Sequence, residues 1–265
     1  MADALAARLE TILPGGKGVW VPMDHSASAF PEYGLGDTNS SVDAAIEGGA
    51  DAIILQKGAV SYHSSRTGWN RVVCHASVST IHGGDRSQDK IVVATASECL
   101  ARGAIGISAQ VNLGDPAEPD MIHRLGLITT ASHELQTPVL GMFYPRGPNL
   151  SLDPSDATSG VAHAARLAWE MGCNVVKVPW TGSEESFNIV TSSVPIPVLV
   201  SGGPRETNFS EILELVEKSI NAGGSGVCIG RHVFGVEDPA SHIRALRAMA
   251  VSYTHLRAHE TEADL

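Results

Sequence analysis

The chain has 265 residues, of which 43% are hydrophobic and 18% charged, and its formal net charge is −11 at pH 7. This length can bury a large core without disulfides or metals, and the composition is that of an ordinary globular protein. The acidic balance would repel a polyphosphate backbone, and no lysine- or arginine-rich run relieves it. Nucleic acid is therefore not an expected partner, whereas a small anionic substrate is compatible with local cations and backbone N–H groups.

Neither a membrane nor an oxidising compartment is indicated. No stretch approaches the roughly 18 apolar residues that cross a bilayer, and residues 1–13 predict a short amphipathic helix rather than a secretion signal. The cysteines Cys74, Cys99, Cys173 and Cys228 lie in apolar stretches and form no C-x-x-C pair. We expect buried free thiols in a reducing cytoplasm.

Short apolar runs recur along the chain, and most are apolar throughout rather than alternating. Strands that are buried on both faces of a parallel sheet have this pattern. Eight such runs are predicted strands: Gly18–Met23, Ala52–Gln56, Arg71–His75, Ala104–Ala109, Val139–Phe143, Asn174–Val178, Pro197–Ser201 and Gly226–Gly230.

Helical patterns lie between these runs. The clearest are Asn39–Glu47, Asp120–Leu135, Ser155–Met171, Ser210–Asn221 and Pro239–Met249. Alternating strands and helices predict a parallel sheet, and eight units predict a single (β/α)₈ barrel. A doubly wound open sheet is the alternative, although no G-x-G-x-x-G follows an early strand.

One domain is expected over residues 1–250. The stretch Ile81–Asp89, after the third predicted strand, is a longer polar loop. Residues 251–265 have no helical stripe, and we interpret them as a non-native tail.

Two of the five lysines, Lys57 and Lys177, stand at the end of an apolar strand, where active sites of such barrels lie. A lysine buried there should lose solvation, so that its pKa falls. The neutral amine can then form a Schiff base with a ketone. Position favours Lys177 over Lys57; snorkelling outward or simple anion binding is the alternative for both.

Glycine turns follow the seventh and eighth predicted strands. Ser201, Gly202 and Gly203 end the seventh, and Gly230 and Arg231 end the eighth. Loops at these two places often bind phosphate through backbone N–H groups, and an arginine adds a charge-assisted contact. The sequence therefore predicts a phosphate site here; the alternative is that these glycines only make tight turns.

Tyr144 and Asp24 also follow or end predicted strands. Tyr144 could move a proton near a cationic imine, and Asp24 could accept a proton or stabilise the iminium. A core aromatic residue and a turn cap are the respective alternatives.

Several histidines follow the early strands, namely His25, His63, His75 and His82. A zinc-dependent aldolase would gather several of them around one metal. Because they form no compact H-x-x-x-H pair, we expect no metal site and no cofactor.

Five motifs together resemble the archaeal-type class I aldolases (DeoC/LacD-like), over about Lys17 to Ala250. They are Val21-Pro-Met-Asp-His25, Met142-Phe-Tyr-Pro-Arg-Gly147, Val176-Lys-Val-Pro-Trp-Thr-Gly182, Ser201-Gly-Gly-Pro204 and Ile229-Gly-Arg231. The resemblance implies a (β/α)₈ barrel, an imine-forming Lys177, an acid/base Tyr144 and an active-site Asp24. It also implies phosphate binding at the glycine turns and at Arg231. Three further substrate contacts are expected, namely His25, Arg146 and Ser201.

Within this group the sequence is most similar to the 2-amino-3,7-dideoxy-D-threo-hept-6-ulosonate synthases of aromatic amino acid biosynthesis, and next to the fructose-1,6-bisphosphate aldolases. The expected reactants are a phosphorylated ketose and an aldehyde, and a cytoplasmic homo-oligomer is expected. Ser26, Trp180 and Ser183 depart from the usual glycine, tyrosine and aspartate, and we expect them to alter the substrate end. The sequence also leaves open a coenzyme A-dependent thiolase, a metal-dependent aldolase and a silent sugar-phosphate-binding barrel.

Overall fold

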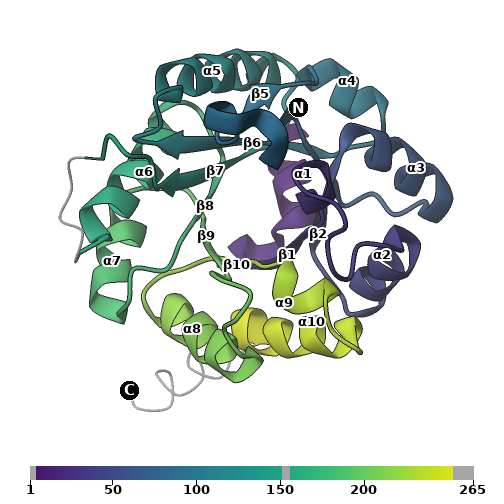
Figure 1. Ribbon diagram of the computed structural model, residues 1–265. Helices are drawn as coiled ribbons and strands as arrows, with labels where there is room; N and C mark the ends of the chain where they lie inside the picture. Colours follow the sequence, from purple (N-terminus) through teal and green to yellow (C-terminus); the bar gives the residue numbers. More distant parts are fainter. Residues whose placement is uncertain (1–3, 151–155, 253–265) are drawn as a thin grey trace.

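The computed structural model describes residues 4–150 and 156–252, which form one closed barrel of parallel strands (Figure 1). The strands follow one another around the barrel in the order β1-β10-β9-β8-β7-β6-β3-β2. Each of the eight coincides with a predicted apolar run. The predicted (β/α)₈ barrel is confirmed, and the open doubly wound sheet is wrong because the first and last strands pair with each other.

Several strands differ from the prediction at their ends, and β6 and β7 extend furthest beyond it. Tyr144 consequently lies within β7 rather than after it. The barrel strands are β1 Gly18–Pro22, β2 Ala52–Gln56, β3 Val72–His75, β6 Gly106–Leu113, β7 Val139–Pro145, β8 Val175–Val178, β9 Val198–Ser201 and β10 Gly226–Cys228.

A ring of helices covers the outside of the barrel (Figure 1). The five predicted helices correspond to α2, α5, α6, α8 and α10, except that Ser155 lies outside the described residues. The described α-helices are α1 Ala4–Ile12, α2 Thr38–Glu47, α3 Lys57–Thr67, α4 Ala96–Ala101, α5 Glu118–Glu134, α6 Thr158–Glu170, α7 Glu184–Ser192, α8 Phe209–Asn221, α9 Arg231–Phe234 and α10 Pro239–Arg247. The short helical turns are η1 Pro14–Gly16, η2 His25–Ala27, η3 Ile81–Arg86 and η4 Ala248–Ser252.

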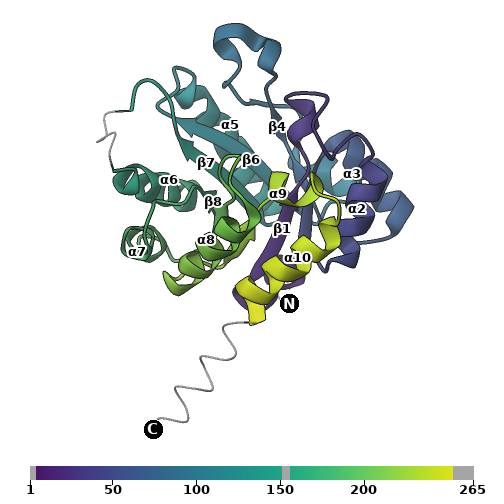
Figure 2. The ribbon, with the colours of Figure 1, turned by 60° about the horizontal axis from the view of Figure 1, so that its bottom comes forward.

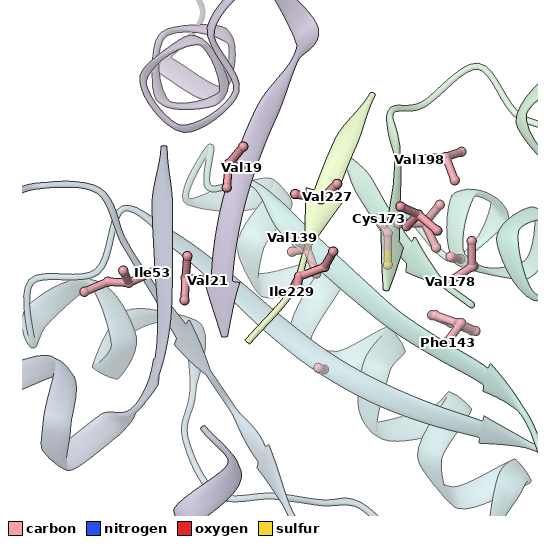
Figure 3. Close-up of a cluster of buried hydrophobic side chains, with 14 of the residues drawn as sticks. Val19, Val21, Ile53, Val139, Phe143, Cys173, Val178, Val198, Val227 and Ile229 are labelled. Atoms are coloured by element: carbon pink, nitrogen blue, oxygen red, sulfur yellow. The ribbon is translucent and has the colours of Figure 1, made fainter. Parts of the chain in front are cut away.

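Side chains alternate between the inside and the outside of the barrel along each strand. Outward-facing side chains pack under the helices; Figure 3 shows ten of them labelled, including Val19, Val21 and Phe143. Fully buried valine and isoleucine dominate this layer, and a second apolar cluster lies inside the barrel. The strands are therefore largely apolar on both faces. Most of the apolar burial that stabilises the fold lies here.

Helix α1 closes the end of the barrel where the strands begin. Ile12 and Leu13 pack into the interior cluster, and Trp20 Nε1 donates a hydrogen bond to the Ile12 carbonyl at 2.6 Å. The interior above them is filled by Leu140, Met142 and similar side chains. This apolar packing closes the amino-terminal end of the barrel interior.

The predicted polar loop after β3 carries a small sheet of its own. Strands β4 Ser77–Val78 and β5 Ile91–Val92 pair antiparallel, and η3 lies between them. In Figure 2 the segment of β4, η3 and β5 lies above the carboxyl ends of the strands, on the same side as α9. It forms one wall of the barrel mouth.

The described chain ends at Ser252, after Ala250 has packed into the core. Val251 and Ser252, the first residues of the predicted tail, belong to η4. Residues 253–265 lie outside the described residues, so the non-native tail stays a prediction. None of the helices in the described chain is both long enough and apolar enough to cross a membrane.

Candidate active site

Lys177 lies inside the barrel near the carboxyl end of β8. Strand register places it beside Met142 of β7 and Leu199 of β9, both of which point into the interior. Only 6% of its surface is exposed. The predicted burial of Lys177 is therefore confirmed.

Tyr144 and Asp24 stand next to this lysine, as the sequence predicted. Lys177 Nζ lies 6.0 Å from the centroid of the Tyr144 ring, within hydrogen-bonding reach of its hydroxyl. Asp24 lies two residues after the end of β1, as the N-cap of η2, and faces the same lysine across the barrel mouth. The three groups thus come together from β1, β7 and β8.

The ionisation of Lys177 differs from the expectation. Burial acts to lower its pKa, but the neighbouring Cys228, Tyr144 and Asp24 outweigh it and raise the pKa above its ordinary value. Burial raises the pKa of Cys228 to about 11, so this thiol is uncharged at neutral pH, and Asp24 is then the anion that favours the ammonium. The predicted fall in the pKa of Lys177 is therefore wrong: the free protein holds an ammonium that faces an aspartate.

Asp24 is partly buried and is surrounded by cationic or basic groups. Burial acts to raise its pKa, and His75, His25 and Lys177 together lower it below the ordinary value. Asp24 Oδ2 lies 3.8 Å from His75 Nε2, and Oδ1 lies 3.9 Å from His25 Nδ1. Since burial lowers the pKa of His75 to about 4, Lys177 is the main cation that faces this carboxylate at neutral pH.

His75 is held in one orientation beneath Asp24. Its Nδ1 lies 2.8 Å from Ser108 Oγ, and its Nε2 lies 3.3 Å from Ser77 Oγ. The Ser77 hydroxyl also accepts a hydrogen bond from the backbone N–H of Gln110 at 3.0 Å. The neutral imidazole therefore supports Asp24 without adding charge to the site.

Two chambers open on either side of Lys177. The larger has a volume of about 510 Å³ and the smaller about 210 Å³. Four residues line both, namely His25, Tyr144, Lys177 and Arg231. A molecule that occupies both chambers would therefore pass directly over the lysine.

The glycine turns form the wall of the smaller chamber. Gly202, Gly203 and Gly230 line it together with Ser201 and Arg231. A side chain at Gly230 would place Cβ only 2.3 Å from the Pro22 carbonyl oxygen, and Gly203 has a φ of +68°. Both positions therefore require glycine, for close backbone approach and for left-handed backbone geometry.

Arg231 and Arg146 are two exposed arginines that border the site. Arg231 is exposed and donates a hydrogen bond to the Gly203 carbonyl at 2.8 Å, which ties the two glycine turns together. Arg146 lies over the Tyr144 ring at 4.9 Å and donates to Asn112 Oδ1 at 3.1 Å. Burial lowers the pKa of Arg146.

The alternative lysine lies away from this site. Lys57 is the first residue of α3, where its ammonium donates to the Val93 carbonyl at 2.6 Å and lies 3.3 Å from Glu98. It lines neither chamber.

The four candidate histidines do not come together. His63 lies on α3 near Thr38, and His82 is exposed on η3. Only His25 and His75 lie beside Asp24. Among residues 4–150 and 156–252, no group of three His, Cys, Asp or Glu side chains is arranged to hold a metal ion.

None of the three departures from the family motifs, Ser26, Trp180 and Ser183, lines either chamber, contrary to expectation. Trp180 packs on Phe187 with ring centroids 5.0 Å apart. Ser183 is the N-cap of α7 and accepts a hydrogen bond from the Ser186 N–H at 3.2 Å. An aspartate can make the same cap, so this change preserves a helix start.

Sequence reasoning missed Lys90, which lines the larger chamber. It lies after η3, in a polar loop that carries no strand-end signal. Its only sequence signal is the scarcity of lysine, since the chain has five.

The family is shown by comparison with known proteins. The model of the DeoC/LacD family aldolases matches residues 18–235. The chain belongs to the DeoC/LacD family of aldolases. This membership confirms the resemblance inferred from the five motifs and the expected enzyme class.

Curated relatives of this aldolase extend along most of the chain. A Streptomyces griseus protein, 2-amino-4,5-dihydroxy-6-oxo-7-(phosphonooxy)heptanoate synthase, is 34% identical over 83% of this chain and 80% of its own. A 2-amino-3,7-dideoxy-D-threo-hept-6-ulosonate synthase from Halobacterium salinarum is 33% identical over 94% and 92%. An archaeal fructose 1,6-bisphosphate aldolase structure has the same fold, with a TM-score of 0.82, 24% identity and coverage of 93% and 98%.

Proposed function

We propose that this aldolase joins a phosphorylated ketone to an aldehyde through a Schiff base on Lys177, in the manner of a heptulosonate synthase. The observation that carries the proposal is a buried lysine between two chambers, with a tyrosine and an aspartate beside it. Such a lysine can act as a covalent nucleophile once it is neutral.

The product named for the Streptomyces griseus relative fits two chambers that meet at one lysine. It is a seven-carbon amino acid with a ketone at C6, a hydroxyl at C4 and a phosphate ester at C7. Breaking the C4–C5 bond, as in a reverse aldol reaction, gives dihydroxyacetone phosphate and aspartate semialdehyde. The ketone of the first fragment is the group that would condense with Lys177.

In the proposed reaction the phosphate binds at Gly202, Gly203, Gly230 and Arg231, in the smaller chamber. Backbone N–H groups and a guanidinium are suited to a phosphate dianion. His25, Ser201 and Arg146 complete the contacts expected around the substrate.

The lysine must lose a proton before it attacks the ketone. Asp24 and Tyr144 are the groups placed to accept it, and later to protonate the departing carbinolamine hydroxyl as water. Loss of a proton from the carbon next to the imine gives an enamine, which attacks the aldehyde carbon. Hydrolysis of the new imine releases the product and restores Lys177.

Fructose-1,6-bisphosphate cleavage is the second candidate, supported by the fold that this chain shares with archaeal enzymes of that name. A mass-spectrometric product assay distinguishes the two. With aspartate semialdehyde, we expect a seven-carbon amino acid phosphate from dihydroxyacetone phosphate. From a deoxy-ketohexose phosphate we expect the unphosphorylated 3,7-dideoxy seven-carbon amino acid, because the donor phosphate leaves with the other fragment. Cleavage of fructose 1,6-bisphosphate without any seven-carbon product would contradict the synthase assignment.

We further propose that the enzyme works in the cytoplasm as a homo-oligomer. The four free, buried thiols suit a reducing compartment. The expectation of assembly rests on the family resemblance, and light scattering of the full chain tests it.

A further inference from the structure

Lys90 is a nearly buried cation that the proposed chemistry does not use. Its side chain is 9% exposed and lines the larger chamber. Within the described ranges, no carboxylate forms an ion pair with its ammonium group and no acceptor forms a hydrogen bond with it. Burial lowers its pKa, and Asp24 acts in the opposite direction.

The backbone around Lys90 is held firmly in place. Arg124 Nη1 donates to Asp89 Oδ1 at 2.5 Å and to the Lys90 carbonyl at 3.2 Å. The Gln88 carbonyl accepts a hydrogen bond from Asn112 Nδ2 at 2.7 Å. Lys90 therefore belongs to a segment anchored on both sides, and its place in the chamber wall is structurally defined.

Asn112, which binds the segment that carries Lys90, also contacts a second cation, Arg146. Asn112 Oδ1 accepts the hydrogen bond from Arg146 Nε, and Arg146 lines the same chamber as Lys90. The two like charges act on one another, since Arg146 lowers the pKa of Lys90. Keeping the nearly buried Lys90 ammonium near a second cation, the exposed Arg146, without an ion pair of its own is costly, and a bound anion would offset that cost.

We propose that Lys90, with Arg146, binds an anionic group at the far end of the aldehyde substrate. This inference rests on the proposed function and adds a residue that selects the acceptor. Phosphate of the donor occupies the glycine turns in the smaller chamber, and the acceptor anion occupies the larger one. A substrate with an anion at each end thereby places its reacting carbons over Lys177.

The test compares acceptors of different charge in the Lys90→Gln enzyme, with dihydroxyacetone phosphate as donor. Succinic semialdehyde supplies a carboxylate, glyceraldehyde 3-phosphate a phosphate, and glyceraldehyde no charge. We expect kcat/KM to fall about 10- to 100-fold for an anionic aldehyde, the loss of a charge-assisted contact. The loss for glyceraldehyde should be several-fold smaller, and Lys90→Arg should restore most of the anion preference.

Lys57→Gln is the matched control, because Lys57 is a lysine of the preceding strand–helix unit that lines neither chamber. An equal loss of kcat/KM for charged and uncharged aldehydes in Lys90→Gln would overturn the proposal. Lys90 would then act only through its electrostatic interaction with Asp24, and not by binding the aldehyde. Unchanged selectivity would overturn the proposal as well. Borohydride trapping of dihydroxyacetone phosphate on wild-type Lys177 is measured in parallel: its failure would contradict the proposed function, independently of Lys90.

Discussion

At the scale of single residues, the site is organised by one ammonium and one carboxylate that share a largely buried environment. Lys177 is buried, yet its pKa is raised because its acidic neighbours outweigh desolvation. The free enzyme therefore stores the nucleophile in its protonated form. In the proposed mechanism, a proton passes to Asp24 or Tyr144 before the imine forms.

Replacement of Asp24 tests this electrostatic coupling. In Asp24→Asn, Lys177 loses an anion that favours the ammonium, so its pKa should fall. Mass spectrometry can measure the extent of reductive methylation of Lys177 at a series of pH values. The pH at which methylation becomes half-maximal should be lower in Asp24→Asn than in wild type. Catalytic turnover should fall about 10²- to 10⁴-fold, because proton transfer is impaired.

Asp43→Asn serves as the control, because Asp43 pairs with Arg66 outside the barrel. Its methylation profile should match wild type. An unchanged or higher midpoint for Lys177 in Asp24→Asn would contradict the coupling.

At the scale of elements, Gly230 in the turn after β10 both lines the smaller chamber and packs against β1. A Cβ at this position would come within 2.3 Å of the Pro22 carbonyl, at the end of β1. The first and last strands of the barrel are joined here. The proposed phosphate site and the closure of the barrel therefore depend on the same position.

Gly230→Ala should lower the free energy of unfolding by about 1–3 kcal/mol, since backbone atoms must move to relieve the overlap. Urea denaturation measures this loss. Gly58→Ala, in α3 with no atom near its added Cβ, should instead raise stability by about 0.5–1 kcal/mol. Equal effects at the two glycines would show that crowding at β1 is unimportant.

The elements themselves could be predicted from sequence because each strand is apolar on both faces. The lysine at the end of β8 and the two glycine turns are sufficient to predict a site at the barrel mouth, and the structure brings them together around the two chambers. Lys90 could not be found this way, since its burial depends on the pairing of β4 with β5 and on the anchor at Asn112. The pKa of Lys177 could not be predicted either, because it depends on Tyr144 of β7, Cys228 of β10 and Asp24 in the loop after β1.

At the scale of the whole molecule, the polar mouth of the barrel makes stability depend on pH. His75 is buried as a neutral imidazole with a pKa of about 4, against an ordinary value of 6.5. Between these values the unfolded chain takes up a proton that the folded protein does not. Stability is therefore lost as pH falls from 6.5 towards 4.

For His75 alone, the free energy of unfolding should fall by about 2 kcal/mol between about pH 7.5 and about pH 5. Urea denaturation of wild type and His75→Asn at both pH values isolates this contribution, because His25, whose pKa burial also lowers, is common to both. We expect the variant to lose about 2 kcal/mol less than wild type over this interval. Parallel losses in the two proteins would mean that His75 is protonated equally in the folded and unfolded states.

The most direct measurement is borohydride reduction of the enzyme with dihydroxyacetone phosphate, followed by peptide mass spectrometry. We expect one reduced adduct, on Lys177, and none in Lys177→Met. An adduct on Lys57 or Lys90, or none on any lysine while aldol product still forms, would contradict imine chemistry at the centre of this barrel.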